Sequence, residues 1–311
     1  MVPVRRSGQG NHLKTRYDYL IGSGWWCADD NSRVVGRPYH GSDVIRSAEF
    51  HHLWSAVIDA WTTPKAVLLV DSASPTPPPI TNQSYRTIRL ASNPGHATVH
   101  TGHYSGWTAS VVHSLEYALS ADVDYFVYVE QDVLLYGEGI IEHCIDRMRK
   151  PLMFGSGAGT PQPLQQSFFI IRKDGMRRFL AGLHAINQPD KVIVPEWKFV
   201  LSSLGVSGTI AEWLCSGEVR RARLFRVFGK LFQSIGFDVL PMGFGRCRPI
   251  DTRADYFYFQ HATLEEMRAY LSRLPISIRD AVAARSEPIA RLFAGEAAEG
   301  AAPRVATPSS R

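Results

Sequence analysis

The stretch that decides the fold is YFVYVEQDVLLYG, residues 125–137, in which two acidic side chains interrupt a run of apolar residues. Its first five residues show no alternation with polar ones, which predicts a strand that is buried on both faces. Glu130, Gln131 and Asp132 follow, and then three more apolar residues. Carboxylates at such a strand end are partly desolvated and repel each other. A divalent cation relieves that repulsion.

Alternate residues of an extended segment point the same way, so Glu130 and Asp132 are expected to face one ligand. Gln131 then faces elsewhere and serves only as a spacer. The alternative interpretation is a solvated strand end or a salt-bridged pair, because acid-x-acid triplets also arise by chance.

Continuous apolar strands alternate with amphipathic helices along the chain. This alternation predicts an α/β fold with a mostly parallel sheet covered by helices on both faces. Ligands of such sheets bind beyond the carboxyl ends of the strands, where Asp71 follows the apolar run AVLLV. DYLIGSGWW, residues 18–26, reads as a first strand that enters a turn at Gly22, Ser23 and Gly24. Helices are expected at about 48–63, 104–120, 138–149 and 176–186, from Pro195, in the basic segment 218–235, and after His261, where Thr263 and Glu266 form a capping-box signal.

Composition bounds the size and the cellular setting. The 311 residues are 45% hydrophobic and 20% charged, which suits one large domain or two modest ones. We expect a basic arm at 1–17, a domain at 18–285 with a nucleotide-binding half to about 150 and an acceptor half from 151, and a low-complexity tail at 286–311, disordered beyond about 295. No apolar run reaches the roughly 18 residues of a membrane span, and the four cysteines are far apart, so a soluble, cytoplasmic protein is predicted.

The basic segment 218–235 leaves two interpretations open. It reads either as a packed helix with a solvated face or as a surface that docks on an anionic membrane or on the diphosphate of a lipid-linked acceptor. The second interpretation would place the protein peripherally on the inner face of the membrane. The chain has no zinc finger, RNA-binding aromatic signature or extended basic stripe, so no nucleic-acid partner is expected.

LLVDSAS and GWTASVVHSLEYALSADVDYFVYVEQD together resemble the GT-A fold of nucleotide-sugar-dependent glycosyltransferases and are similar to family-2-type members. The resemblance covers about residues 18–200. It implies that Asp132, as the last acid of a DxD-like motif, binds the Mn²⁺ or Mg²⁺ that bridges the donor pyrophosphate. Glu130 replaces the first Asp, which leaves open whether it contacts sugar, ribose or metal. By the same resemblance, Asp71 contacts the base or the ribose, and the turn at Gly22 and Ser23 lies near the nucleotide.

Two further residues come from the resemblance. Glu196, at the start of a helix, corresponds to the general base that takes the proton from the acceptor hydroxyl. An acid in the first turn after Pro195 also fits an ordinary helix N-terminus. His261 resembles the late histidine that completes the metal site in many GT-A enzymes, and its alternative is a surface histidine.

The sequence therefore predicts a metal-dependent glycosyltransferase. It would move a sugar from a nucleotide-sugar donor to a hydroxyl of a glycan or lipid-linked glycan, in bacterial-type surface polysaccharide or glycoconjugate synthesis. One alternative is a sugar-nucleotidyltransferase, although GSGWWCADD is not the glycine- and lysine/arginine-rich loop that such an enzyme carries. Another is a non-catalytic relative that binds a nucleotide or a sugar.

Overall fold

A seven-stranded sheet forms the centre of the protein, with the strand order β3-β2-β1-β4-β7-β6-β8. The computed structural model describes residues 17–28, 43–96, 99–157, 160, 162–205, 235–242 and 250–293. The strands of this sheet are β1 (Tyr19–Trp25), β2 (Ala66–Asp71), β3 (Tyr85–Arg89), β4 (Tyr125–Val129), β6 (Leu152–Ser156), β7 (Leu164–Arg172) and β8 (Asp238–Val239). Strands β3, β2, β1 and β4 pair in parallel, β7 is antiparallel to both β4 and β6, and β6 and β8 are parallel.

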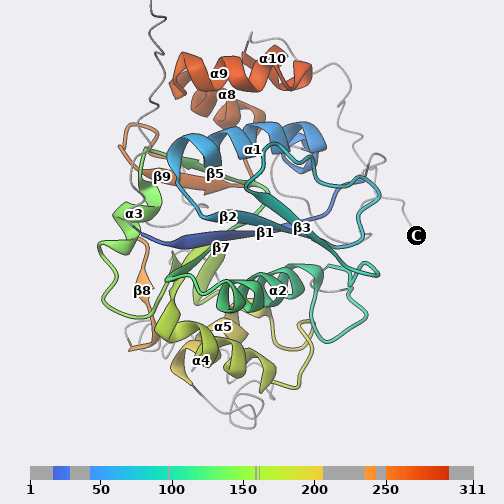
Figure 1. Cartoon of the computed structure of the whole chain (residues 1–311), viewed down its shortest axis with the longest axis vertical. Coiled ribbons are helices and arrows are strands. Elements are labelled where there is room, and N and C mark those ends of the chain that lie inside the picture. The colour runs from blue at the N-terminus through green and yellow to red at the C-terminus, as the bar shows by residue number, and fades with distance from the viewer. Residues whose placement is uncertain are drawn as a thin grey trace, which may run out of the picture.

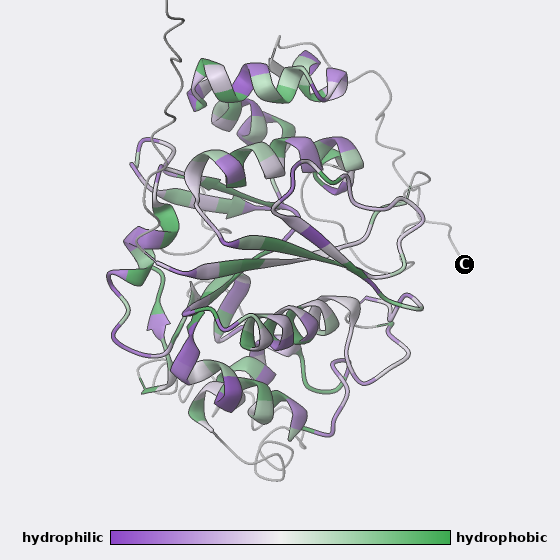
Figure 2. Cartoon of the chain, in the orientation of Figure 1, coloured by the Kyte–Doolittle hydropathy of each residue, from purple (hydrophilic) through white to green (hydrophobic). Residues whose placement is uncertain are grey.

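Helices cover both faces of this sheet, which confirms the predicted fold class. Figure 1 shows α1 together with α8, α9 and α10 on one face, and α2, α4 and α5 on the other. The described helices are the 3-10 helix η1 (Asp43–Arg46) and α1 (Ala48–Trp61), α2 (Gly106–Ser120), α3 (Ile140–Ile145), α4 (Lys173–His184), α5 (Pro195–Leu204), α8 (Leu264–Arg273), α9 (Ile276–Ala283) and α10 (Glu287–Phe293). Figure 2 shows green, hydrophobic strands between helices that carry purple, hydrophilic stretches.

The two faces of the sheet bury two separate cores, because successive side chains of a strand point to opposite sides. In β4, for example, Val127 and Val129 pack with α1 and the C-terminal helices, whereas Phe126 and Tyr128 pack with α2, α4 and α5. A strand buried on both faces needs apolar residues at every position. This is why the predicted continuous run at 125–129 is correct.

Local sequence signals fix several helix ends as expected. The capping box after His261 is present: Thr263 Oγ1 accepts a hydrogen bond from Glu266 N at 3.2 Å, and Glu266 Oε2 accepts one from Thr263 N at 3.0 Å. Ser105 is the N-cap of α2, close to the predicted start of that helix. The helix expected at 138–149 is shorter, because α3 covers only Ile140–Ile145.

The stretch 125–137 is not one interrupted strand. Its second apolar run forms β5 (Val133–Tyr136), which leaves the large sheet and pairs antiparallel with β9 (Phe257–Gln260) in a separate two-stranded sheet. The acidic residues therefore lie at the point where the chain passes from one sheet to the other.

The turn predicted at Gly22 to Gly24 is wrong, because β1 continues through these residues to Trp25. A Cβ on Gly22 would lie 2.6 Å from Ser114 Cβ, and a Cβ on Gly24 would lie 2.7 Å from Ser110 Oγ. Both distances are too short for real contacts. The glycines therefore let α2 pack closely against β1, so the Gly-Ser-Gly pattern indicates close packing rather than a turn.

The ends of the domain differ in part from expectation. Helix α10, residues 287–293, lies inside the segment predicted as a low-complexity tail, and it packs against α9 and α1. Residues 1–16 of the basic arm and almost all of the basic segment 218–235 lie outside the described residues. Among the helices that the structure describes, none is long and apolar enough to cross a membrane.

Candidate functional site

The acidic triplet forms a tight turn at the carboxyl end of β4. Glu130 N still donates to Ser167 O on β7 at 2.8 Å, and Val133 N then donates back to Glu130 O at 3.0 Å. The predicted alternation of side chains along an extended segment is therefore wrong. The position of Glu130 and Asp132 is set instead by the change of chain direction between the seven-stranded sheet and the two-stranded sheet.

Gln131, which the sequence suggested was only a spacer, holds this turn against β1. Its Oε1 accepts a hydrogen bond from Trp26 N at 2.8 Å, and its Nε2 donates to Trp26 O at 3.1 Å. From α1, Trp54 Nε1 donates to Glu130 O at 3.1 Å. The side-chain amide thus replaces the backbone pairing that β4 no longer supplies, and a glutamine between two acids was the only sequence signal for it.

Asp132 and His261 lie together, as the resemblance implies. His261 Nε2 is 3.3 Å from Asp132 Oδ2, and both side chains are largely buried. The pairing follows from the second sheet: Val133 is opposite Gln260, so the residue before β5 faces the residue after β9. His261 has a φ of 56°, a left-handed conformation that is uncommon for a residue with a Cβ. Strain of this kind persists where the surrounding structure over-determines it, and it is frequent at functional sites.

Glu130 lies within electrostatic reach of the Tyr128 hydroxyl in the core beneath the turn. Burial raises the pKa of Tyr128, and the negative charges of Glu130 and, to a smaller extent, Asp132 raise it further. The Tyr128 hydroxyl is 2.7 Å from Ser110 Oγ of α2, and it accepts a hydrogen bond from Gly24 N at 3.2 Å. A protonated phenol, two residues before Glu130, thus ties β1, β4 and α2 together.

Asp71 ends β2 at the same edge, where it is opposite Trp25 of β1. Its carboxylate is buried, with Oδ1 accepting from Ser74 N at 2.8 Å and Oδ2 paired with the half-exposed Arg89 guanidinium. These contacts give Asp71 a structural task in the turn after β2. The predicted contact with the donor base or ribose stays a prediction, and Arg89 is the part of the pair that is open to solvent.

Gly22 and Ser23 lie farther back in β1, and Ser23 is 1% exposed. Gly22 is opposite Leu68 and Tyr128, in the middle of the parallel sheet. Their predicted place in a turn beside the nucleotide is therefore wrong, and any donor contact from them stays a prediction.

Glu196 lies in the first turn of α5, directly after Pro195. Two residues later, Lys198 Nζ forms a fully buried ion pair with Asp190 Oδ1 at 2.8 Å. The other oxygen, Asp190 Oδ2, accepts from Ser105 N at 2.7 Å and from Ser105 Oγ at 2.8 Å. Asp190 therefore joins the start of α5 to the start of α2, and sequence patterns gave no sign of it. Whether Glu196 acts as a base stays a prediction.

The predicted metal ligands form a pair rather than a set of three. Among the described residues, no group of three or more His, Cys, Asp or Glu side chains is arranged to hold a metal ion. Asp132 and His261 do present an oxygen and a nitrogen 3.3 Å apart at the strand end. Mg²⁺ in nucleotide sites is commonly held by one or two carboxylates and completes its shell with substrate phosphates and water. The Asp132 carboxylate fits such a cation, whereas the His261 imidazole adds a nitrogen ligand that suits transition metals better than Mg²⁺, and Glu130 lies outside the set.

Comparison with known proteins finds no matching family model and no similar curated protein. Among solved structures, the chain is similar to a cytidylyltransferase from Leptospira borgpetersenii serovar Hardjo-bovis, with 9% identity, a TM-score of 0.36, and 91% of this chain and 98% of that one covered. It is also similar to the mannosyltransferase PcManGT from Pyrobaculum calidifontis in complex with GDP-Man and Mn²⁺, with 11% identity, a TM-score of 0.35, and 70% and 83% covered.

A third similar structure is the galactosyltransferase LgtC in complex with donor and acceptor sugar analogs. Identity is 14% and the TM-score is 0.32, over 53% of this chain and 62% of that one. Overlaps this loose carry no argument about chemistry. The fold class rests instead on the observed strand order of a mostly parallel sheet that helices cover on both faces.

Proposed function

We propose that the protein is a metal-dependent glycosyltransferase that moves a sugar from a nucleotide-sugar donor to a hydroxyl of a glycan or lipid-linked acceptor. The observation that supports it most is the Asp132–His261 pair, with 3.3 Å between Oδ2 and Nε2, at the carboxyl edge of a parallel sheet. That edge is where open α/β sheets bind their ligands.

On the donor side, Asp132 and His261 would hold the cation. A bound Mn²⁺ or Mg²⁺ supplies electrostatic stabilisation of the charge that grows on the leaving nucleoside diphosphate. Gln131 and Tyr128 keep the strand-end turn fixed through their bonds to Trp26, Ser110 and Gly24. Such fixed donors and carboxylates need no rearrangement as charge develops, which is what electrostatic catalysis requires.

On the acceptor side, Glu196 would take the proton of the attacking hydroxyl. The Asp190 network supports this assignment, because it anchors the start of α5 beside the start of α2. Helix α2 leads directly into β4, so its first turn belongs to the carboxyl edge of the sheet. Glu196 is thereby on the same side of the molecule as Asp132.

A thermal-shift screen tests donor class and metal use together. The melting temperature of the purified protein is measured with UDP, GDP, CDP, ADP or dTDP, each with and without 1 mM Mn²⁺. A ligand that binds the folded state raises the melting temperature by mass action. We expect one diphosphate to raise it, and to do so only with Mn²⁺. If no nucleotide shifts the transition under either condition, the donor site is not present.

Turnover is tested on the nucleotide-sugar of the base that binds. We expect slow, Mn²⁺-dependent release of nucleoside diphosphate, which Asp132→Ala abolishes and the exposed-carboxylate control Asp280→Ala leaves unchanged. Metal-dependent release that persists in a folded Asp132→Ala variant would refute the proposal. Release of pyrophosphate from a nucleoside triphosphate and a sugar phosphate would instead establish a sugar-nucleotidyltransferase.

A further inference from the structure

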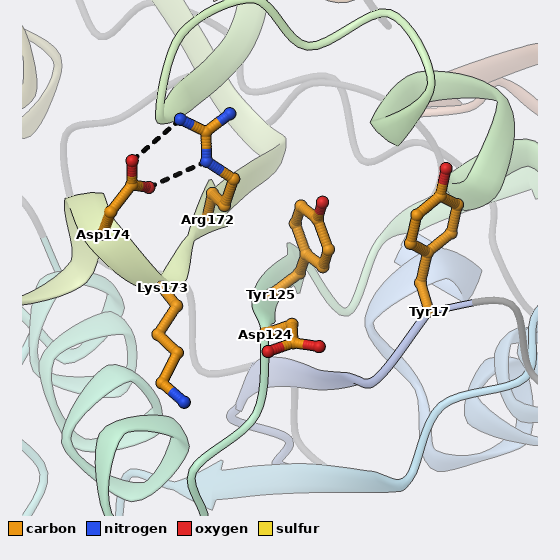
Figure 3. Close-up of a pocket in the computed structure, with 6 residues that line it drawn as sticks. All are labelled: Tyr17, Asp124, Tyr125, Arg172, Lys173 and Asp174. Carbon is orange, nitrogen blue, oxygen red and sulfur yellow. Dashed lines mark hydrogen bonds and ion pairs between the residues drawn. The ribbon is translucent and has the colours of Figure 1, made fainter.

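A pocket of about 440 Å³ opens on the opposite edge of the sheet from Asp132. It lies at the amino ends of β1 and β4, beside the carboxyl end of the antiparallel β7. Figure 3 shows the six residues that line it: Tyr17, Asp124, Tyr125, Arg172, Lys173 and Asp174. β1 alone has seven residues and spans roughly 20 Å at about 3.3 Å per residue, so the two edges form separate sites.

Two tyrosines form one wall of this pocket and stand side by side with their hydroxyls pointing the same way (Figure 3). Their ring centroids are 5.6 Å apart at an interplanar angle of 80°, an edge-to-face arrangement that holds both rings. The Tyr17 hydroxyl donates to Asp146, which fixes that ring at its far end as well. Rigid tyrosines offer flat contact area at a small cost in conformational entropy.

The basic groups of the pocket are ion-paired at the protein surface. Arg172 donates to Asp174 through Nε and Nη2, both at 2.8 Å, and Lys173 Nζ is 2.8 Å from Asp122. The backbone beneath is tied too, because Lys173 N donates to Asp124 O at 2.8 Å. The lining therefore presents paired donors and acceptors, and the side chains of Arg172, Lys173 and Asp174 are 34–56% exposed.

The charges of this lining favour a neutral ligand. Two acids, Asp124 and Asp174, balance two bases, Arg172 and Lys173, and each base already has a carboxylate partner. A phosphate or carboxylate ligand would have to displace those partners and would face Asp124. A polyhydroxyl ligand can instead add hydrogen bonds to the open lone pairs and N–H groups and lay its C–H face on a tyrosine ring.

We propose that this pocket binds a neutral glycan, as a holding site remote from the strand-end site. A sugar ring combines an apolar face with many neutral hydroxyls, which matches an aromatic wall beside a charge-balanced set of donors and acceptors. The inference does not depend on the proposed transfer reaction, since binding here requires neither metal nor nucleotide.

An array of neutral and anionic glycans, probed with the fluorescently labelled full chain in EDTA, tests the proposal. Hits are confirmed by calorimetric titration of wild type, Tyr125→Ala and Tyr125→Phe, each first shown by its melting curve to be folded. We expect at least one neutral glycan to bind, about tenfold more weakly to Tyr125→Ala and within about threefold of wild type to Tyr125→Phe, because the ring supplies the contact. Tyr17→Ala, outside the strands, is a second variant that should weaken the same hits.

Donor hydrolysis of Tyr125→Ala separates this inference from the proposed function. It should equal that of wild type whatever the glycan result. No neutral hit on the array, stronger binding of anionic than neutral glycans, or equal affinity in wild type, Tyr125→Ala and Tyr17→Ala would each overturn the holding site.

Discussion

His51, in α1, gives the protein a stability that depends on pH in a defined direction. Its side chain is 2% exposed, stacks on Trp54 at 5.3 Å between centroids and meets Trp25 edge-on at 5.1 Å. Burial and, to a smaller extent, the neighbouring His52 lower the pKa of His51 to about 4, although a hydrogen bond to the Pro79 backbone opposes the shift. The group therefore stays neutral in the folded protein at neutral pH.

The direction in which stability changes with pH follows from the lowered pKa of His51. Between pH 6.5 and pH 4 the unfolded chain binds a proton at His51 that the folded protein does not, so stability rises with pH in this window and is lost on acidification. With 6.5 in the unfolded state and about 4 in the folded state, linkage gives a loss of about 2 kcal/mol between pH 7 and pH 5.

Urea unfolding followed by tryptophan fluorescence measures this loss. Between pH 7 and pH 5, the free energy of unfolding of wild type should fall by about 2 kcal/mol more than that of His51→Phe, because phenylalanine keeps the aromatic packing and does not titrate. His113→Phe, which removes a partly exposed histidine of α2, should keep the wild-type pH dependence. Parallel pH profiles for wild type and His51→Phe would refute the burial argument.

Three other variants test how the frame of the site is built, each by urea unfolding at pH 7. Gly22→Ala should lower the free energy of unfolding by about 1–3 kcal/mol, because the added methyl group overpacks against α2. Ser114→Gly alone should lower it by about 1 kcal/mol, but the double variant should be no less stable than Gly22→Ala. Additive losses in the double variant would contradict the contact between the two residues. Gln131→Glu should cost about 2 kcal/mol, because a carboxylate oxygen replaces the donor that faces a backbone carbonyl; an unchanged midpoint would argue against that bond. Lys198→Met should lower the free energy of unfolding by about 3–5 kcal/mol, because it leaves the Asp190 carboxylate without its counter-charge in the interior. Adding Asp190→Asn to that variant should restore part of the loss. A loss below about 1 kcal/mol in Lys198→Met would contradict the burial of the pair.

Local sequence signals were sufficient for most of the framework. Continuous apolar runs predicted the central parallel strands, because every side chain of a strand that is covered on both faces is buried. The capping box at Thr263 and Glu266 and the proline at Pro195 located two helix starts, since caps act within one turn. Glycine was ambiguous: Gly22 reads equally as a turn or as a close helix approach, and only a neighbour 92 residues away along the chain, Ser114, decides between them.

In the strand-end site, too, some features follow from neighbours along the chain and others only from tertiary contacts. The sequence by itself determined that carboxylates follow β4 and that His261 precedes a capped helix, because both facts concern neighbours along the chain. Only the tertiary structure decided that the second apolar run of the opening stretch pairs with β9, which sets Asp132 at 3.3 Å from His261. It likewise decided that Gln131 holds Trp26. Strand partners and side-chain amide bonds join residues separated by more than a hundred positions, and their register is fixed by the packing of the whole domain rather than by any local preference.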